Sequence, residues 1–349
     1  MLSSMSHFAF ALLFLLQAKP LAALPLLQAP VSAEDLKAFS IFEQYSAAAY
    51  CPNNTEHADR KIRCDNESCP TVETAQTRTV LGLSEAGKSG VTGFLATDQT
   101  NNQIVLAFRG TDSYKNAMTD IDFFITNSSL CESCGVASGF SSAWNESRVL
   151  VMSILNQTKT KYPLSKIIVT GHSLGGALAT LATAELRKNN VSVDMYTFGS
   201  PRVGNSAFAN WMTSLPPSLG KSYRFTHMSD PVPQYPSTII GYEHISPEYY
   251  ISSPTNQTVK AADITELKSG ESWSGNRQWF RMATADHGWY FGNITACSDG
   301  AAYPFPMGLG NLKGYGPGSI VTDSGWRSTD FTLPPDLNPS PGSVSTAPP

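Results

Sequence analysis

The spacing of hydrophobic positions changes from one segment of the chain to the next, and it predicts the order of the elements. Residues 34–50 carry apolar side chains three and four positions apart, which is the spacing of an amphipathic helix. Short, continuous apolar runs predict buried strands over 104–109, 167–170, 193–198 and 223–226. Residues 149–155 are expected to be part of a helix, and a helix rich in small residues is expected over 177–186. Strands that alternate with helices indicate an α/β protein with a mostly parallel central sheet and helices on both faces.

The two ends of the chain differ from this central part. Residues 8–16 form an apolar run that is too short to span a bilayer but suits the core of a signal peptide. We therefore assign 1–23 to a signal peptide, and a buried amino-terminal helix is the alternative. A single domain is expected over 24–297. Residues 298–349 are rich in Gly and Pro, which predicts a partly disordered carboxy-terminal extension.

Composition and charge narrow the class of protein. The chain has 349 residues, of which 41% are hydrophobic and 15% charged, and its formal net charge is −4. The apolar fraction is sufficient for a large core. A mixed, slightly acidic sequence without a clustered basic run argues against nucleic-acid binding, because phosphate neutralisation requires grouped Lys and Arg.

Sequons and cysteines are typical of an extracellular protein. The glycosylation candidates are Asn53, Asn66, Asn127, Asn145, Asn156, Asn190, Asn256 and Asn293. The six cysteines are Cys51, Cys64, Cys69, Cys131, Cys134 and Cys297. An even number of cysteines in an oxidising compartment favours three disulfides, but the sequence leaves the connectivity open. A zinc site or a redox-active Cys131–Cys134 pair is the less favoured alternative.

The most specific chemical signal is the sequence GHSLGG at residues 171–176, which contains G-x-S-x-G. An apolar strand leads into it and a helix of small residues follows, which is the context of a nucleophile elbow. Such a turn lifts the hydroxyl of Ser173 out of the sheet. It also places the amide of Leu174 at a helix N-terminus, where N–H groups are free to bind an oxyanion. A glycine-rich loop that only packs a helix on a strand is the alternative.

A serine nucleophile needs a base, and the base needs an orienting carboxylate. In this architecture the chain order is serine, acid, histidine, which selects Asp230 in a strand-end loop and His287 beyond it. His244 is the competing base, whereas His227 precedes Asp230 and is interpreted as structural. The weaker candidates for the acid are Asp194, Asp263 and Asp286.

With these motifs, the chain resembles the secreted class 3 lipases of filamentous fungi. That family includes feruloyl esterases and mono- and diacylglycerol lipases. The shared landmarks occur in order from about residue 34 to 297 and read QYSAAAYC, VTGFLATD, VLAFRGT, SGFSSAW, VTGHSLGGALA, FGSPRVGN, HMSDPVP, GYEHISPEYY and DHGWYFG. The resemblance implies an α/β-hydrolase-like catalytic domain over 24–297.

The resemblance also implies roles for individual residues. Ser173 corresponds to the nucleophile, Asp230 to the acid and His287 to the base. Thr111 and Leu174 correspond to the oxyanion hole. The implied disulfides are Cys51–Cys297, Cys64–Cys69 and Cys131–Cys134. The chemistry requires no metal and no organic cofactor.

The segment after FRGT corresponds to the lid of the family. Its apolar positions fall on one face of a short predicted helix and are Tyr114, Ala117, Met118 and Ile121. At a lipid–water interface this face is expected to turn outward and expose the site. Ala117 stands where many of these lipases carry a lid tryptophan. We therefore expect a modest rise of activity at interfaces and better acceptance of partial glycerides than of long-chain triglycerides. A permanently packed surface helix is the alternative.

Together these features predict a secreted serine hydrolase that cleaves acylglycerol esters through an acyl-enzyme intermediate. Its partner is the ester substrate, reached by transient contact with a lipid surface. A feruloyl or other soluble-ester esterase is the enzymatic alternative. A catalytically silent secreted binding protein is the non-enzymatic alternative.

Overall fold

The computed structural model describes residues 31–111 and 121–298. The expected signal peptide lies outside these ranges, and so does all of the carboxy-terminal extension except Ser298. Tyr114, Ala117 and Met118 of the expected lid also lie outside the described residues.

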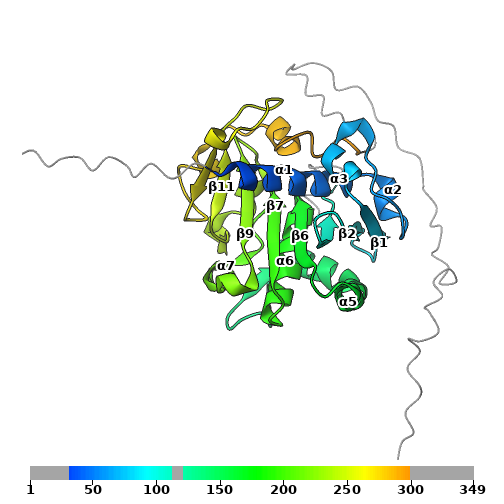
Figure 1. The fold of residues 1–349 in the computed structure, drawn as a ribbon. Coiled ribbons are helices and arrows are strands. Elements are labelled where there is room, and N and C mark those ends of the chain that lie inside the picture. The colour runs from blue at the N-terminus through cyan, green and yellow to red at the C-terminus, as the bar shows by residue number, and fades with distance from the viewer. Residues whose placement is uncertain (1–30, 112–120, 299–349) are drawn as a thin grey trace, which may run out of the picture. The chain divides into compact units, whose positions relative to one another are not determined.

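An eight-stranded sheet forms the centre of the described chain, in the order β1-β2-β3-β6-β7-β9-β11-β12 (Figure 1). These strands are β1 (Thr77–Ala86), β2 (Val91–Asp98), β3 (Gln103–Phe108), β6 (Lys166–His172), β7 (Val193–Phe198), β9 (Ser222–His227), β11 (Glu248–Ile251) and β12 (Ile264–Leu267). The strands from β3 to β11 run parallel to one another, and antiparallel pairs complete both edges. The mostly parallel sheet predicted from the alternation of strands and helices is confirmed.

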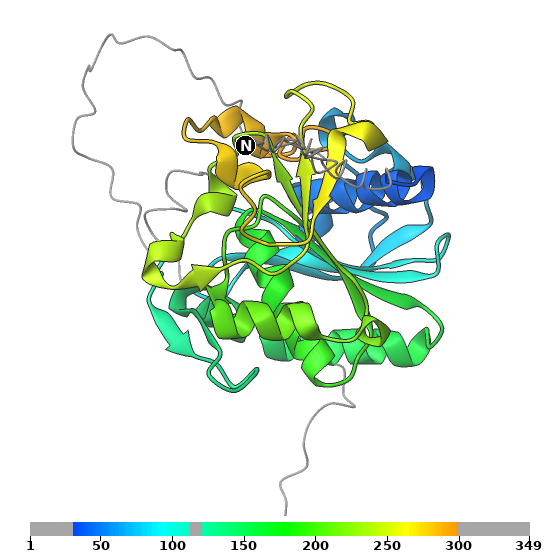
Figure 2. The ribbon, with the colours of Figure 1, turned by 90° about the vertical axis from the view of Figure 1, so that its left-hand side faces the viewer.

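Helices cover both faces of this sheet. They are α1 (Ala33–Ala48), α2 (Pro52–Thr55), α3 (Pro70–Thr74), α5 (Ser138–Lys161), α6 (Leu174–Lys188) and α7 (Ser206–Ser214). Figure 2 shows α1, in blue, on one side of the sheet and the green helices on the other. The sheet thus separates two apolar cores, one beneath α1 and one beneath α5 and α6.

Short elements fill the connections that carry the site. A small second sheet pairs β4 (Ile125–Asn127), β5 (Gly135–Ala137), β8 (Gly204–Asn205) and β10 (Tyr242–Glu243). The 3-10 turns are η1 (Asp65–Glu67), η2 (Pro217–Leu219), η3 (Val232–Gln234), η4 (Thr238–Ile240), η5 (Ala261–Asp263), η6 (Asn276–Gln278) and η7 (Thr284–Gly288).

The outer strands of the sheet differ from the sequence-based expectation. Strands β1, β2, β11 and β12 have no continuous apolar run in the sequence. The two edge strands, β1 and β12, bury fewer of their side chains, whereas β2 is buried at every position but reads VTGFLATD, in which Thr and Gly interrupt the apolar residues. Residues 149–155, which were expected to be part of a helix, form the middle of α5, and this prediction is confirmed; the buried positions of α5 begin at Phe140. Packing against α6 extends that helix beyond its most apolar segment.

All six cysteines form disulfides. The pairs are Cys51–Cys297, Cys64–Cys69 and Cys131–Cys134, which are those that the family resemblance implies. No cysteine thiolate therefore remains as a zinc ligand. The eight sequon asparagines are all exposed, where a glycan can be attached. Within the described residues, no helix is long and apolar enough to cross a membrane.

Candidate active site

Ser173 occupies a tight turn between β6 and α6. Its backbone has φ 57° and ψ −128°, a conformation that residues with a side chain rarely adopt. Two flanking glycines make the turn possible: a Cβ on Gly171 would collide with the carbonyl of Gly175, and a Cβ on Gly175 would collide with the carbonyl of Phe108. The local geometry is that of the nucleophile elbow predicted from the sequence.

Asp230 and His287 form a buried pair. Nδ1 of His287 lies 3.0 and 2.9 Å from the two carboxylate oxygens of Asp230. Because a carboxylate only accepts, Nδ1 carries the proton and Nε2 is left as a proton acceptor. Asp230 also accepts hydrogen bonds from the hydroxyl of Tyr290 (2.7 Å) and the N–H of Val232 (2.8 Å). These donors compensate for the burial of the carboxylate.

The elbow and the Asp230–His287 pair lie next to each other. The N–H of Ser173 donates to the carbonyl of Phe198 at 2.9 Å. The following residue, Gly199, lies so close to Asp230 and His287 that a Cβ there would touch both side chains. The structure thus brings together the three residues that the sequence selected, although Asp230 and His287 lie 57 and 114 positions after Ser173 in the chain.

His172, which precedes Ser173, supports this arrangement from within the core. Its ring lies 4.5 Å from that of His287, and its Nε2 donates to the backbone carbonyl of His287 at 2.9 Å. Its Nδ1 accepts from the Tyr50 hydroxyl (2.6 Å), which in turn accepts from the N–H of Gly110 (3.1 Å). Burial, and to a smaller extent the charge of His287, holds the pKa of His172 well below its usual value. His172 is therefore a neutral hydrogen-bonding spacer.

Thr111 and Leu174 lie on one cavity beside the elbow. Leu174 is the first residue of α6, where the helix itself does not use the backbone N–H groups. Thr111 follows β3 and is the last described residue before the gap at 112–120. Both residues line a cavity of about 340 Å³ whose apolar walls are Val91, Ala143, Leu174 and Leu178. Its other side chains are polar or charged and belong to Glu85, Ser89, Thr92, Arg109 and Thr111.

The other histidines considered from the sequence are engaged elsewhere. His244 donates from Nε2 to the carbonyl of Pro233 at 2.7 Å, and burial together with Arg224 and Arg202 holds its pKa well below its usual value. His227 lies between the carbonyls of Asp286 and Ser253.

The weaker candidates for the acid also have other partners. Asp194 pairs with Lys166 at 2.6 Å. Asp263 accepts the backbone N–H of Lys260, and Asp286 accepts the hydroxyls of Ser229 and Thr255. The geometry therefore favours Asp230 as the partner of His287.

Sequence reasoning did not find the residues that support the pair. Tyr290 lies three positions after His287 inside the landmark DHGWYFG, and Tyr50 lies inside QYSAAAYC. Both landmarks were noted, but neither tyrosine has a local pattern that distinguishes it from a core aromatic residue.

Ile121 is the one expected lid residue within the described ranges. It lies in a bend rather than in a helix, and it packs against the core beside Gly139.

Comparisons with known proteins agree with this fold. The class 3 lipase family matches residues 105–239. The secreted mono- and diacylglycerol lipase A of Penicillium cyclopium is 38% identical over 280 residues, which are 79% of this chain and 90% of that protein. The secreted mono- and diacylglycerol lipase 1 of Fusarium solani is 36% identical over 269 residues, which are 77% of this chain and 79% of that protein.

A solved structure gives the same result. The crystal structure of the mono- and diacylglycerol lipase from Aspergillus oryzae superimposes with a TM-score of 0.72 at 40% identity, covering 77% of this chain and all of that one. The chain therefore belongs to the class 3 lipase family and has the α/β-hydrolase fold. It is a carboxylic ester hydrolase.

Proposed function

We propose that this protein is a secreted acylglycerol lipase in which Ser173 is the nucleophile, His287 the base and Asp230 the orienting acid. The observation that carries the proposal is the contact of His287 Nδ1 with both oxygens of Asp230, at 3.0 and 2.9 Å, beside the elbow at Ser173. In the neutral imidazole this contact places the proton on Nδ1, so that Nε2 is the nitrogen that takes the serine proton.

The proposed reaction has two halves. Oγ of Ser173 attacks the ester carbonyl carbon while its proton passes to Nε2 of His287, and Asp230 stabilises the imidazolium. The tetrahedral oxyanion then collapses, the bond to the leaving alcohol breaks, and His287 returns the proton to that alcohol. Water repeats the sequence on the acyl-enzyme and releases the fatty acid. Only protein groups and water take part.

Thr111 and Leu174 are proposed to form the oxyanion hole, in which their backbone N–H groups donate hydrogen bonds to the oxyanion. Their positions on one cavity beside Ser173 support this role, because backbone N–H groups at a helix N-terminus stabilise negative charge that develops on an ester oxygen. The hydroxyl of Thr111 is a further donor.

Acylglycerols are proposed as substrates because the relatives with the same fold are named mono- and diacylglycerol lipases. Exposed apolar side chains beside the site support contact with a lipid surface: Ile239 is 92% exposed and Phe280 is 89% exposed. Ile239 lies in the loop that follows Asp230, and Phe280 lies in the segment that leads to His287. In Figure 2 both segments, yellow-green and orange, lie toward the left of the view.

The loop over 231–241 contains no charged residue, and an uncharged surface of this kind favours contact with an uncharged glyceride.

We assign the lid to the segment that includes Tyr114, Ala117, Met118 and Ile121, and we keep the expected preference for partial glycerides.

Secretion and processing are also proposed. The apolar run at 8–16 supports removal of 1–23 as a signal peptide, and the exposure of the eight sequon asparagines supports their glycosylation. Amino-terminal sequencing of the secreted protein, and its mass before and after endoglycosidase treatment, test both points.

The substrate assignment is tested by comparing hydrolysis of tri-, di- and monoacylglycerols with hydrolysis of methyl ferulate. We expect hydrolysis of the acylglycerols, with the mono- and diacylglycerols preferred, and a rise in rate above the solubility limit of the substrate. Faster hydrolysis of methyl ferulate, without any rise at an interface, would replace the lipase proposal by the soluble-ester esterase. Ser173→Ala should abolish hydrolysis of every substrate, and retention of a tenth of the wild-type kcat would refute the nucleophile assignment.

A further inference from the structure

The loop that carries Asp230 is held in place through its backbone carbonyl groups. It contains three prolines between residues 231 and 236, and proline has no N–H to donate. Three buried side chains supply donors instead. Asn276 donates to the carbonyls of Met228 (3.1 Å) and Asp230 (2.8 Å), His244 to that of Pro233 (2.7 Å), and Arg202 to those of Gln234 (2.6 Å) and Pro236 (2.9 Å).

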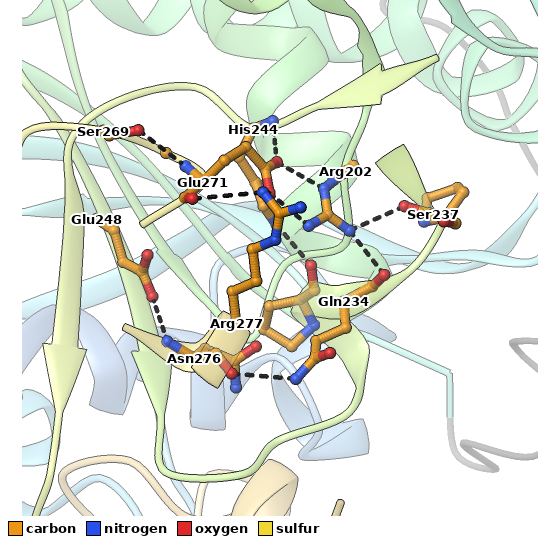
Figure 3. Close-up of polar contacts among 12 residues, drawn as sticks. Arg202, Gln234, Ser237, His244, Glu248, Ser269, Glu271, Asn276 and Arg277 are labelled. Atoms are coloured by element: carbon orange, nitrogen blue, oxygen red, sulfur yellow. Dashed lines mark hydrogen bonds and ion pairs between the residues drawn. The ribbon is translucent and has the colours of Figure 1, made fainter. Parts of the chain in front are cut away.

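Asn276 is the member of this group that touches the acid residue itself. Its side chain is 3% exposed, and its Nδ2 faces two carbonyl oxygens. Only the nitrogen of the amide can face them, because the amide oxygen would meet two other acceptors. Its own backbone carbonyl accepts Nε2 of Gln234 at 3.0 Å (Figure 3). Asn276 therefore binds the loop at two places.

Glu248 anchors Asn276 to the central sheet. Its Oε1 accepts the backbone N–H of Asn276 at 2.9 Å and the hydroxyl of Thr226 at 2.5 Å. Glu248 begins β11 and Thr226 lies in β9, and these are adjacent parallel strands. A Cβ on Gly275 would press against the Glu248 carboxylate and displace it from this position. The position of Asn276 is therefore set by its contact with the sheet as well as by its own 3-10 turn.

A second anchor holds the far end of the loop. The guanidinium of Arg202 binds Glu271 through two hydrogen bonds of 2.7 Å, and Glu271 also accepts the N–H of His244 at 3.0 Å (Figure 3). Burial raises the pKa of Glu271, but the hydrogen bonds and charge of Arg202 outweigh it and lower the pKa overall. The carboxylate stays ionised, and Arg202 keeps its orientation toward the loop.

We propose that Asn276 is a positioning residue that fixes Asp230 relative to His287. Asn276 lies eleven positions before His287 in the chain, so its side-chain contact with Asp230 ties the loop of the acid to the segment that leads to the base. Loss of this tie lets the carboxylate shift from His287 Nδ1, and a displacement of about 1 Å in such a site costs roughly 100-fold in rate. The inference rests on the proposed function of Asp230 and His287.

The test compares Asn276→Ala with a matched variant, Asn54→Ala. Asn54 is also a fully buried asparagine whose Nδ2 donates to two backbone carbonyls, those of Ala48 and Arg63, at 2.9 and 2.8 Å. It binds no segment of the proposed site. Asn276→Asp keeps the size of the side chain and removes the donor, and it serves if the alanine variant does not fold.

Activity is measured with a short-chain, water-soluble p-nitrophenyl ester, below the thermal midpoint of each variant. It is normalised to the number of Ser173 sites that react with a small phosphonate. We expect both Asn276 variants to lose about 10- to 100-fold in kcat and in the rate of phosphonylation, with KM changed less than about twofold. Asn54→Ala should lower the thermal midpoint and keep the wild-type kcat.

The inference is overturned if the folded Asn276 variants keep the kcat and phosphonylation rate of Asn54→Ala, because the role of Asn276 is then only structural. It is also overturned if KM alone changes. Ser173→Ala, measured in parallel, separates this outcome from a failure of the proposed function. If Ser173→Ala retains activity, the site assignment itself is wrong, whatever the Asn276 variants do.

Discussion

The turn around Ser173 and the loop around Asp230 are built in opposite ways. The turn is made by consecutive residues, and its shape depends on the missing side chains of Gly171 and Gly175, which allow close backbone contact. The loop depends on polar side chains that are distant in sequence, with Asn276 and Arg202 as the donors. The comparison teaches that the nucleophile is positioned by local sterics and the acid by long-range hydrogen bonds. The two regions should therefore fail differently when they are altered.

The largest effect is expected at Asp230. Asp230→Asn should lower kcat by about 1,000- to 10,000-fold, because an amide neither fixes the protonation of His287 nor stabilises the imidazolium. Thermal unfolding and kcat with a soluble ester are the measurements. Asp98→Asn is the matched control, since Asp98 is 1% exposed and accepts a tyrosine hydroxyl at 2.8 Å. The control should lose stability and keep kcat, whereas a tenfold loss or less for Asp230→Asn contradicts the assignment.

A change in the elbow should act on the fold instead. Gly175→Ala places a Cβ against the backbone carbonyls of Phe108 and Arg109, which cannot move aside as a side chain can. The free energy of unfolding, measured with denaturant, should fall by more than about 4 kcal/mol. Gly292→Ala is the control, because a Cβ there meets Glu43 at ordinary van der Waals distance. Equal stability of the two variants would show that steric exclusion does not shape the elbow.

A buried carboxyl group near the segment of Tyr290 should make the free energy of unfolding depend on pH. Behind it lies Glu43 of α1, which is 2% exposed and whose Oε1 has no hydrogen-bond partner among the described residues. Burial raises the pKa of Glu43 to about 8 from 4.5, although a backbone hydrogen bond from Gly292 opposes the shift. Between these pH values the unfolded chain loses the proton and the folded chain keeps it. The free energy of unfolding should therefore fall as pH rises, by up to about 4 kcal/mol between pH 5 and pH 8.

Glu43→Gln should remove this dependence and stabilise the protein at pH 8. The measurement is denaturant unfolding at pH 5 and pH 8, with the exposed Glu132→Gln as the control that should behave as wild type. An unchanged slope in Glu43→Gln would mean that another group produces the pH dependence.

The smallest effect is expected at Tyr290, one of the donors to the Asp230 carboxylate. Tyr290→Phe removes a 2.7 Å hydrogen bond, and kcat should fall about tenfold, since a hydrogen bond to a charged group contributes roughly 1.5–3 kcal/mol. Tyr45→Phe removes an equivalent 2.8 Å bond to Asp98, remote from the proposed site. Both variants should lose similar stability, and only the first should lose kcat. Equal kcat in the two variants would remove Tyr290 from the positioning of Asp230.

The sequence by itself determined the features that depend on neighbouring residues. The strand, turn and helix around Ser173 follow from a local apolar run, two glycines and a helix of small residues. The order of Ser173, Asp230 and His287 followed from the architecture that this turn defines. The sheet was recognised from its buried central strands, because a continuous apolar run is visible in a short window of sequence.

Only the tertiary structure decided which polar groups meet. Asn276 and Tyr290 contact Asp230 although they lie 46 and 60 positions away from it in the sequence. The residues around each of them form no pattern from which this contact could be predicted. The edge strands β1 and β12 are likewise defined by pairing with their neighbours rather than by their own composition. The physical reason is that hydrophobic periodicity records burial residue by residue, whereas a buried hydrogen bond depends on two distant segments and on the packing that brings them together.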